Sequence, residues 1–320
     1  MTKNNLKLES FFQDIRSDVD KEIKNILKDK NIMKALKGGK RLRPFLTQLS
    51  FKTCTQGKET LPQYKKSLEG TITIELAHSA SLVHDDIIDK DEERRGNSAL
   101  HIKEGISKAI LVGHKMLNRG LNIALNHGKE LTNLYVETWK DVVDGEINEI
   151  DFNKGNRNIK QKFSTKSQIF EAYKRIIDLK TAKLFASSCK AGALEANMAR
   201  DISQVFYKYG REIGLAYQLA DDLVDLANGE LLDSVILPLL NQLEDSKTIK
   251  KLKENKIKKK LENNRKEVEE FYIKEIKKHV KNAEKLANSG KIPNSGYKNL
   301  LQDAPRYIIN KMLKEIKITI

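Results

Sequence analysis

The chain has 320 residues, of which 39% are hydrophobic and 32% are charged, and its formal net charge is +15. This composition allows a large core, while no run of residues approaches the ~18 apolar residues that a transmembrane helix needs. The first residues, MTKNNLKLESFFQDIRSDVDKEI, are interrupted by acids and contain no apolar segment, so we expect no secretory signal and a cytoplasmic protein.

The excess of positive charge admits two interpretations, nucleic-acid binding or a solvated helical surface. Lysines concentrate between residues 247 and 281, where glutamates and asparagines are interleaved with them and no aromatic residue precedes Phe271. Base stacking therefore has no platform among these charges. We expect a solvated helical face and no nucleic-acid partner.

Helical periodicity dominates the chain, and strand-like alternation is nearly absent. Apolar residues recur at helical spacing in five segments, 67–90, 107–126, 130–150, 167–196 and 199–226. Helices that are apolar around most of their circumference are buried in large bundles. The polar stretch 153–166 and the Gly/Pro-containing stretch 288–296 are predicted loops, and neither has the character of a domain linker. The sequence predicts an all-α fold with one domain over residues 1–320.

Two of these helices end in the same acidic pattern, Asp-Asp-x-x-Asp, directly after a very apolar run. The first pattern lies in SLVHDDIIDKDEERRG and the second in GLAYQLADDLVD. Residues i and i+4 share a helix face, so the first and last aspartates of each motif project together, while the middle one points about 100° away. The aspartates are Asp85, Asp86, Asp89, Asp221, Asp222 and Asp225. Their positions predict that carboxylates from two helices emerge from the core into one cleft.

Like charges are tolerable at such a cleft if a hard dication bridges them. Mg²⁺ prefers octahedral oxygen, retains several waters, and is usually held by one or two carboxylates together with substrate phosphates. Zinc fits less well because the motifs offer no His or Cys, and calcium fits less well because there is no EF-hand loop. We therefore predict a magnesium site that all six aspartates help to form.

Basic residues in three places predict the recognition of polyphosphates. An arginine pair follows the first motif, and the planar fork of arginine bonds two oxygens of a diphosphate. A compact cationic cluster stands in LKGGKRLRP, where two glycines allow close backbone approach, and a lysine stands in DLKTAKLF on an otherwise apolar helix. These residues are Lys40, Arg41, Arg43, Arg94, Arg95, Lys180 and its neighbour Thr181.

With these motifs in this order, the chain resembles the trans-polyprenyl diphosphate synthase family, and within it the geranylgeranyl diphosphate synthases. The match runs through GGKRLRP, HSASLVHDDIIDKDEERRG, LKTA, YQLADDLVD and LQDAPRYIINKM. The resemblance implies a helical bundle around a deep central cavity, a homodimer, and three magnesium ions when substrate is bound. It also implies the reaction: metals and cations stabilise the departing diphosphate of an allylic substrate (dimethylallyl, geranyl or farnesyl diphosphate), and isopentenyl diphosphate attacks the allylic cation.

The resemblance further implies roles for individual residues. The metal ligands and catalytic aspartates correspond to Asp85, Asp89 and Asp221, with Asp86, Asp222 and Asp225 completing the two motifs. The positions that hold the allylic diphosphate correspond to Arg94, Lys180, Thr181 and Gln218, with Lys180 also counted as catalytic. The positions that hold isopentenyl diphosphate correspond to Lys40, Arg43, His78 and Arg95, and Arg41 stands in the same cationic cluster.

Small residues four and five positions before the first motif, Ser81 and Ala80, bear on product length. In the family, aromatic residues there close the cavity and stop growth near fifteen carbons. Three residues of helix rise ~4.5 Å, about one isoprene unit, so an open level admits a further addition. The next candidates for a floor on this helix are Ala77 and Ile74. We predict a product of twenty carbons, geranylgeranyl diphosphate, with a longer chain (C25 or more) as the alternative.

The chain departs from the family pattern after the second aspartate motif. There it reads LANGELLDSVILPLL, with no lysine between Asp225 and Lys247, so a lysine that helps to clamp the allylic diphosphate in the family is missing. This departure keeps open the alternative of a non-catalytic subunit in a heteromeric synthase. A class I terpene cyclase would share the fold, but it usually lacks the second aspartate motif and the isopentenyl diphosphate site, so it fits less well.

Overall fold

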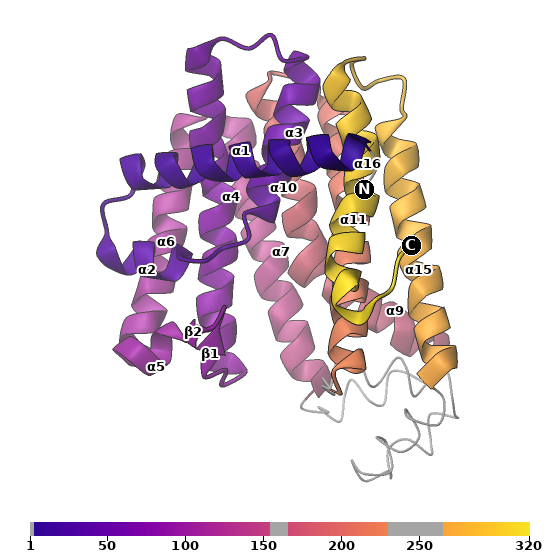
Figure 1. Cartoon of the computed structure of the whole chain (residues 1–320). Coiled ribbons are helices and arrows are strands. Elements are labelled where there is room, and N and C mark those ends of the chain that lie inside the picture. Colours follow the sequence, from indigo (N-terminus) through magenta and orange to yellow (C-terminus); the bar gives the residue numbers. More distant parts are fainter. Residues whose placement is uncertain (1–2, 154–165, 230–264) are drawn as a thin grey trace.

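Helices make up almost all of the structure, a computed structural model that describes residues 3–153, 166–229 and 265–320. The helices of these parts are α1 (Lys3–Ile26), α2 (Lys30–Leu36), α3 (Leu42–Thr55), α4 (Leu61–Ile88), α5 (Leu100–Glu104), α6 (Ile106–Asn126), α7 (Lys129–Asn153), α9 (Lys166–Ile177), the π-helix η1 (Asp178–Ala182), α10 (Lys183–Glu195), α11 (Arg200–Ala227), α15 (Arg265–Ala287), α16 (Gly296–Leu313) and the 3-10 helix η2 (Lys314–Ile316). The predicted all-α class is confirmed. Figure 1 shows the long helices running alongside one another, with α1 crossing over one face of the bundle.

Helix α4 lies inside the bundle and carries the first aspartate motif at its C-terminal end. It starts with a capping box, in which the Thr60 hydroxyl accepts from the Gln63 backbone N–H and the Gln63 side chain accepts from the Thr60 N–H. Its residues from Ser67 onward are buried around most of the circumference, because α3, α6, α7 and α10 all pack against it. The apolar run therefore delivers its terminal carboxylates from the core, as the sequence predicts.

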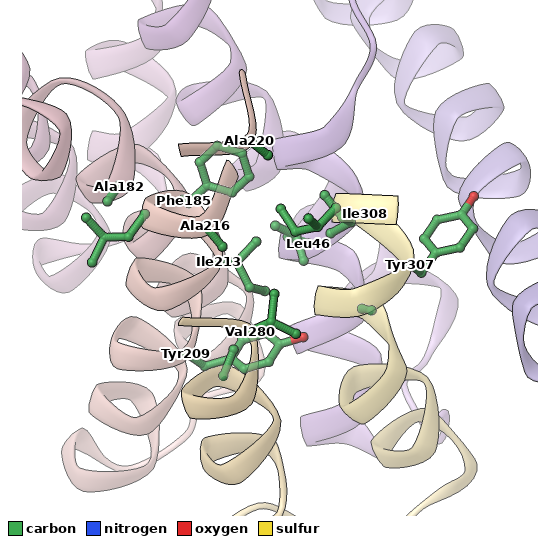
Figure 2. Packing of buried hydrophobic residues seen from close by; sticks show 14 of the residues in the cluster. Leu46, Ala182, Phe185, Tyr209, Ile213, Ala216, Ala220, Val280, Tyr307 and Ile308 are labelled. Carbon is green, nitrogen blue, oxygen red and sulfur yellow. The ribbon is translucent and has the colours of Figure 1, made fainter. Parts of the chain in front are cut away.

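Helices α10 and α11 are packed closely and form the centre of the larger core cluster. A Cβ at Gly214 would lie 2.5 Å from the Cα of Ala182, so only glycine permits this approach of α11 to η1. Phe185, Ile213 and Ala216 belong to the core cluster at this interface, and Leu46 of α3 packs in the same cluster (Figure 2). The packing fixes the register in which the second aspartate motif stands beside η1.

A short hairpin follows α4 and places the predicted arginine pair. Strand β1 (Glu93–Arg94) pairs antiparallel with β2 (Asn97–Ser98), which leaves Arg95 and Gly96 as the two loop residues. Both have positive φ, 56° and 69°, the conformation of a type I′ turn. Because the turn reverses the chain at Arg95, the two arginines stand at the tip of the hairpin.

A second core cluster joins α1, α2, α4 and α6, and Phe11 of α1 packs against both clusters. In the described part of the chain, no helix combines the length and the apolarity that a bilayer span requires. Residues 154–165 of the predicted polar loop lie outside the described residues. So does the stretch 230–264, which contains most of the lysine-free segment and the first half of the lysine-rich segment.

Candidate active site

A cavity of about 920 Å³ lies where the C-terminal ends of α4 and α11 meet the start of α3, the hairpin and η1. Both aspartate motifs reach it, and so do all three groups of basic residues. The predicted residues that line it are Lys40, Arg41, Arg43, His78, Ser81, Asp85, Asp89, Arg94, Arg95, Lys180, Thr181, Gln218, Asp221 and Asp225. Segments separated by up to 185 positions in the sequence thus converge on one space.

The carboxylates that line the cavity differ in exposure: Asp85 and Asp221 are partly buried, whereas Asp89 is exposed. Burial raises the pKa of Asp85 well above its usual range; Lys180 opposes this effect, and nearby carboxylates, Glu146 foremost, add to it. Burial likewise raises the pKa of Asp89, against the attraction of Lys180. Burial also raises the pKa of Asp221, against the attraction of Lys40. A divalent cation would relieve this cost, because it favours the charged form of every carboxylate around it.

The donor set fits magnesium in the way the sequence predicts. Among residues 3–153, 166–229 and 265–320, no three acidic, His or Cys side chains lie close enough together to hold an ion by themselves. Magnesium does not require such a cage, because one or two carboxylates, substrate phosphates and water complete its shell. Asp85 and Asp89 on one side and Asp221 and Asp225 on the other offer oxygen ligands of this kind.

Lys180 stands on the π-helix η1, a feature often found at functional sites. Its Nζ donates to Glu146 Oε1 of α7 at 3.0 Å and also to Glu149. Burial alone would lower the pKa of Lys180, but its attraction to Asp85 and these two glutamates raises it. Helix α7 can come this close only because residue 145 is glycine. A Cβ there would lie 2.7 Å from the Lys180 backbone nitrogen. The lysine is therefore a fixed positive charge at the cavity wall.

The middle aspartate of the first motif points away from the cavity, as the 100° step along a helix requires. Asp86 is 3% exposed, and it accepts a hydrogen bond from Arg94 Nε at 2.6 Å. Arg94 also bonds Asp91 through Nη2 at 2.9 Å. In this structure Asp86 orients Arg94 and does not line the cavity; its expected role as a metal ligand stays a prediction.

The middle aspartate of the second motif is also turned inward. Asp222 is 2% exposed; it accepts hydrogen bonds from Tyr173 and, at 3.0 Å, from Gln218 Nε2. Gln218 Oε1 in turn accepts from Thr181 Oγ1 at 2.7 Å. Burial raises the pKa of Asp222 to about 7, although both bonds oppose the shift. Asp222 does not line the cavity and holds Gln218 and, through it, Thr181; its expected role as a metal ligand stays a prediction.

Arg41 lines the cavity, but its donors are directed into the protein. Nε donates to Asp20 Oδ1 at 2.8 Å, Nη1 to Glu75 Oε1 at 2.6 Å, and Nη2 to the Leu36 carbonyl at 2.8 Å. The side chain is 5% exposed and that of Glu75 is 2% exposed. We had expected Arg41 to bind substrate; these bonds instead make it the residue that anchors the start of α3 to α4.

Arg43, in contrast, keeps donor capacity at the cavity. Its Nη1 donates to His78 Nε2 at 2.9 Å, and its guanidinium lies over the Phe185 ring, 4.5 Å from the centroid. Its buried Nε has no hydrogen-bond partner among the described residues. Burial lowers the pKa of Arg43 to about 10. Burial, followed by the charge of Arg43, also holds the pKa of His78 well below its usual range, so His78 is neutral and accepts from the arginine.

The predicted chain-length residues are placed differently from our expectation. Ser81 lines the main cavity, but Ala80 packs with Val112 and Met116 of α6. Ala77 and Ile74 belong to two further core clusters, in which they pack with side chains of α6, α7 and α10. Neither residue lines the main cavity.

A second cavity of about 340 Å³ opens beside Ser81 and Asp85, which line both spaces. It lies between α4, α6 and α7, and its walls are mostly apolar, including Ile88, Val142 and Trp139. Trp139 also packs against the cluster that contains Ala77, so its indole closes the pocket in that direction. Sequence reasoning missed Trp139, although it is the single tryptophan of the chain and follows the helical apolar spacing of 130–150.

Other residues at the main cavity also escaped the sequence analysis, namely Glu75, Asp91 and Tyr217. Glu75 carries a recognisable signal, because it is the lone acid in the otherwise uncharged run GTITIELAHSA. Such a residue is buried only if it is paired. The two glutamates that hold Lys180 stand among several acids in DGEINEID and carry no comparable signal.

Comparison with known proteins places this site in a family. A family model described as polyprenyl synthetase matches residues 25–273. The geranylgeranyl diphosphate synthase of Methanosarcina mazei is 28% identical over 200 residues, which are 60% of this chain and 56% of the relative. The heptaprenyl diphosphate synthase component 2 of Geobacillus stearothermophilus is 32% identical over 222 residues, 66% and 64% of the two chains. The chain thus spans less than two thirds of the length of either relative.

The fold has close counterparts among solved structures. The polyprenyl synthase from Caulobacter crescentus CB15, crystallised with calcium and isoprenyl diphosphate, superposes with a TM-score of 0.76 at 20% identity, over 95% of this chain and 97% of that one. At this identity the likeness concerns the fold. The family model, in contrast, supports membership of a family, because it matches most of the chain. The matched residues include both aspartate motifs and all the basic residues that line the cavity. The chain belongs to the polyprenyl synthetase family.

Proposed function

We propose that this chain is a magnesium-dependent prenyltransferase that condenses isopentenyl diphosphate with an allylic diphosphate. One observation carries the proposal: a single cavity combines carboxylates of both aspartate motifs with lysines and arginines from three other segments. This combination suits two diphosphates, one held through metal ions and one held directly by cations. The names of the relatives, synthases of geranylgeranyl and heptaprenyl diphosphate, agree with this chemistry.

The residues divide between the two diphosphates according to their partners. Magnesium ions held by the aspartates would stabilise negative charge on the departing allylic diphosphate. Lys180 adds a fixed charge at that end, and Thr181 is oriented by Gln218. Arg43, held by neutral His78 and retaining an unbonded Nε, faces the other end and suits isopentenyl diphosphate. The chemistry needs no protein nucleophile.

The direct test is turnover with purified protein. Labelled isopentenyl diphosphate and each allylic primer are incubated with Mg²⁺, with and without excess EDTA. We expect labelled prenyl diphosphate that depends on the metal and on a primer. Full turnover in excess EDTA would refute the metal requirement. Absence of product with every primer would point to the alternative, a non-catalytic subunit, and the assay is then repeated with a catalytic partner chain added.

We further propose that the product grows into the apolar cavity between α4, α6 and α7 and reaches twenty carbons. Ser81, small and shared by both cavities, leaves the entrance open, and Trp139 closes the far end. Longer products remain the alternative, since the relatives include a synthase of geranylgeranyl and one of heptaprenyl diphosphate.

Two substitutions test the proposed path in opposite directions. Ser81→Phe should shorten the product by filling the entrance, and Trp139→Ala should lengthen it by removing the floor. Lys140→Ala, at an exposed neighbour on α7, is the matched control and should leave the distribution unchanged. Products are dephosphorylated and sized by chromatography. Unchanged products from active Ser81→Phe and Trp139→Ala variants would mean that the chain grows elsewhere.

We also propose that a second copy of this chain covers α6 and α7. Of the ten large hydrophobic residues that are exposed in the described part of the chain, six lie on these two helices: Ile106, Ile110, Leu111, Leu125, Val136 and Ile147. Exposed apolar residues gathered on two neighbouring helices favour an association surface, and identical chains most often pair through one self-complementary patch. A different subunit is the alternative, because one relative is named as component 2 of its synthase.

Light scattering coupled to size exclusion separates these cases. The purified chain should have the mass of a dimer, and Leu111→Glu combined with Val136→Glu should give a monomer. Leu61→Glu changes a residue that is 67% exposed at the start of α4, and it should leave the dimer intact. A monomeric wild type would favour the heteromeric alternative.

A further inference from the structure

A third cavity, of about 220 Å³, lies on the opposite side of the arginine pair from the main cavity. We call it the hairpin pocket; its walls come from α2 with the segment after it, α4, the hairpin and α5. Water occupies about 30 Å³ per molecule in the liquid, so the pocket has room for about seven waters. This space suits a small anion and is too small for a long prenyl chain.

Cations outnumber acids in the walls of the hairpin pocket. Five lysines or arginines line it, Lys34, Lys37, Arg94, Arg95 and Lys103, against one acid, Asp86. Asp86 is already bonded to Arg94, and Lys34 is paired with Glu104 at 2.5 Å. Among the described residues, no carboxylate pairs with the three remaining cations.

Arg95 is the least compensated of these cations. Its Nη1 donates a long hydrogen bond to the Lys37 carbonyl at 3.5 Å. Its stem runs beside Gly38, where an added Cβ would lie 3.7 Å from Arg95 Cδ. Burial lowers the pKa of Arg95, against the attraction of Glu75. A guanidinium with so few partners is a binding group for an anion.

A buried hydroxyl supplies an independent sign of a missing ligand. Ser79 lines the pocket and is 1% exposed, and its Oγ has no hydrogen-bond partner among the described residues. In helices, serine hydroxyls commonly bond a carbonyl one turn earlier, as Ser81 does with His78. A buried unpaired hydroxyl costs free energy, and rotation of the Ser79 side chain toward the pocket would let a phosphate oxygen accept from it. His78, one residue earlier on α4, lines the main cavity instead.

From these contacts we propose that the hairpin pocket is a second diphosphate-binding site, separate from the reaction cavity. Lys37, Arg95 and Lys103 supply the charge, and Ser79 donates to a phosphate oxygen. Its ligand is inorganic diphosphate or the head group of a short prenyl diphosphate, whose tail would meet Val83 and Leu100. Arg94 and Arg95 line both cavities, so an anion in one weakens the attraction for an anion in the other, and the effect is reciprocal.

Binding is measured without turnover, so the outcome does not depend on the proposed function. The background is the Lys40→Ala/Arg43→Ala variant, in which the reaction cavity is weakened. Equilibrium dialysis with labelled inorganic diphosphate should show one site per chain. Adding Lys37→Ala and Lys103→Ala should weaken it about tenfold or more, the order expected for lost charge-assisted hydrogen bonds. Ser79→Ala should weaken it less.

The matched control adds Lys65→Ala and Lys66→Ala, which remove the same charge from the exposed start of α4. The proposal is overturned if the control substitutions weaken diphosphate binding as much as the pocket substitutions do. It is also overturned if the background protein, Lys40→Ala/Arg43→Ala, binds no diphosphate. A parallel titration with isopentenyl diphosphate distinguishes the ligand sources. If isopentenyl diphosphate and inorganic diphosphate bind with equal affinity, the pocket recognises the diphosphate alone. If isopentenyl diphosphate binds more tightly, the apolar wall contributes to recognition.

Discussion

Replacing Arg41 by methionine tests whether this arginine serves the fold or the substrate. The substitution keeps most of the side-chain volume but removes three internal hydrogen bonds, to Asp20, Glu75 and the Leu36 carbonyl. Glu75 would then remain as a charge that is 2% exposed. Removing one partner of a buried ion pair costs about 3–5 kcal/mol, most of it from the uncompensated charge left behind. Glu75 lines the cavity but its side chain is only 2% exposed, so little water reaches the carboxylate.

Thermal unfolding followed by circular dichroism measures this cost. At about 2 °C per kcal/mol for a chain of this size, the Tm should fall by about 6–10 °C. The double variant Arg41→Met/Glu75→Leu should recover most of the loss, because replacing both partners by apolar groups is often neutral. Lys40→Met, at the exposed neighbouring position, is the control and should melt like the wild type. An unchanged Tm for Arg41→Met together with a raised KM for isopentenyl diphosphate would refute the structural role.

Three further predictions concern the cavity. Asp85→Asn and Asp221→Asn should each lower turnover by orders of magnitude with unchanged circular dichroism, since each removes a charged oxygen ligand from the site; near-normal turnover would contradict the assigned role. Lys40→Ala and Arg43→Ala should raise the KM for isopentenyl diphosphate more than that for the allylic primer, and the reverse ranking would exchange the two subsites. Folding raises the pKa of Asp222 from its usual 3.8 to about 7, so its protonated form contributes stability that is complete below about pH 4 and is lost as the pH rises through about 7. The Tm should therefore fall as the pH rises from about 4 to about 7 and level off above that, and Asp222→Asn should flatten that slope; equal slopes would show that another group titrates.

The positions of the helices could be predicted because each has an apolar face of helical period. The segment 199–226 differs by one residue at each end from α11, and 107–126 by one residue from α6. The prediction began α4 six residues late, although T-L-P-Q at Thr60 is a capping signal legible in the sequence. The π-helix within 167–196 was not predictable. It lies against Gly145 of α7, and helical periodicity carries no record of a neighbouring helix.

Within the site, helical geometry predicts which aspartates project together but not what the others meet. Asp85 and Asp89 line the cavity and Asp86 does not, as the i, i+4 rule requires. That Asp86 meets Arg94 depends on a hairpin whose turn was not predicted from RRGN. Arg41 finds its carboxylates 21 and 34 residues away in the sequence. Such tertiary partners decide whether a basic residue is structural or available, and spacing alone cannot supply them.

The choice of partners therefore determines which positive charges face the substrate. Of the two arginines in GGKRLRP, Arg41 is bonded to internal carboxylates, while Arg43 has a buried Nε without a hydrogen-bond partner among the described residues. The arginine pair of the hairpin divides in the same way: Arg94 is bonded to two aspartates, and Arg95 to a single carbonyl at long distance. In each pair, the arginine that is bonded to carboxylates (Arg41 or Arg94) holds its segment in place. The other arginine (Arg43 or Arg95) is thereby positioned to bind an anion. Removing a structural arginine should thus impair binding through its neighbour, even though it donates nothing to the substrate.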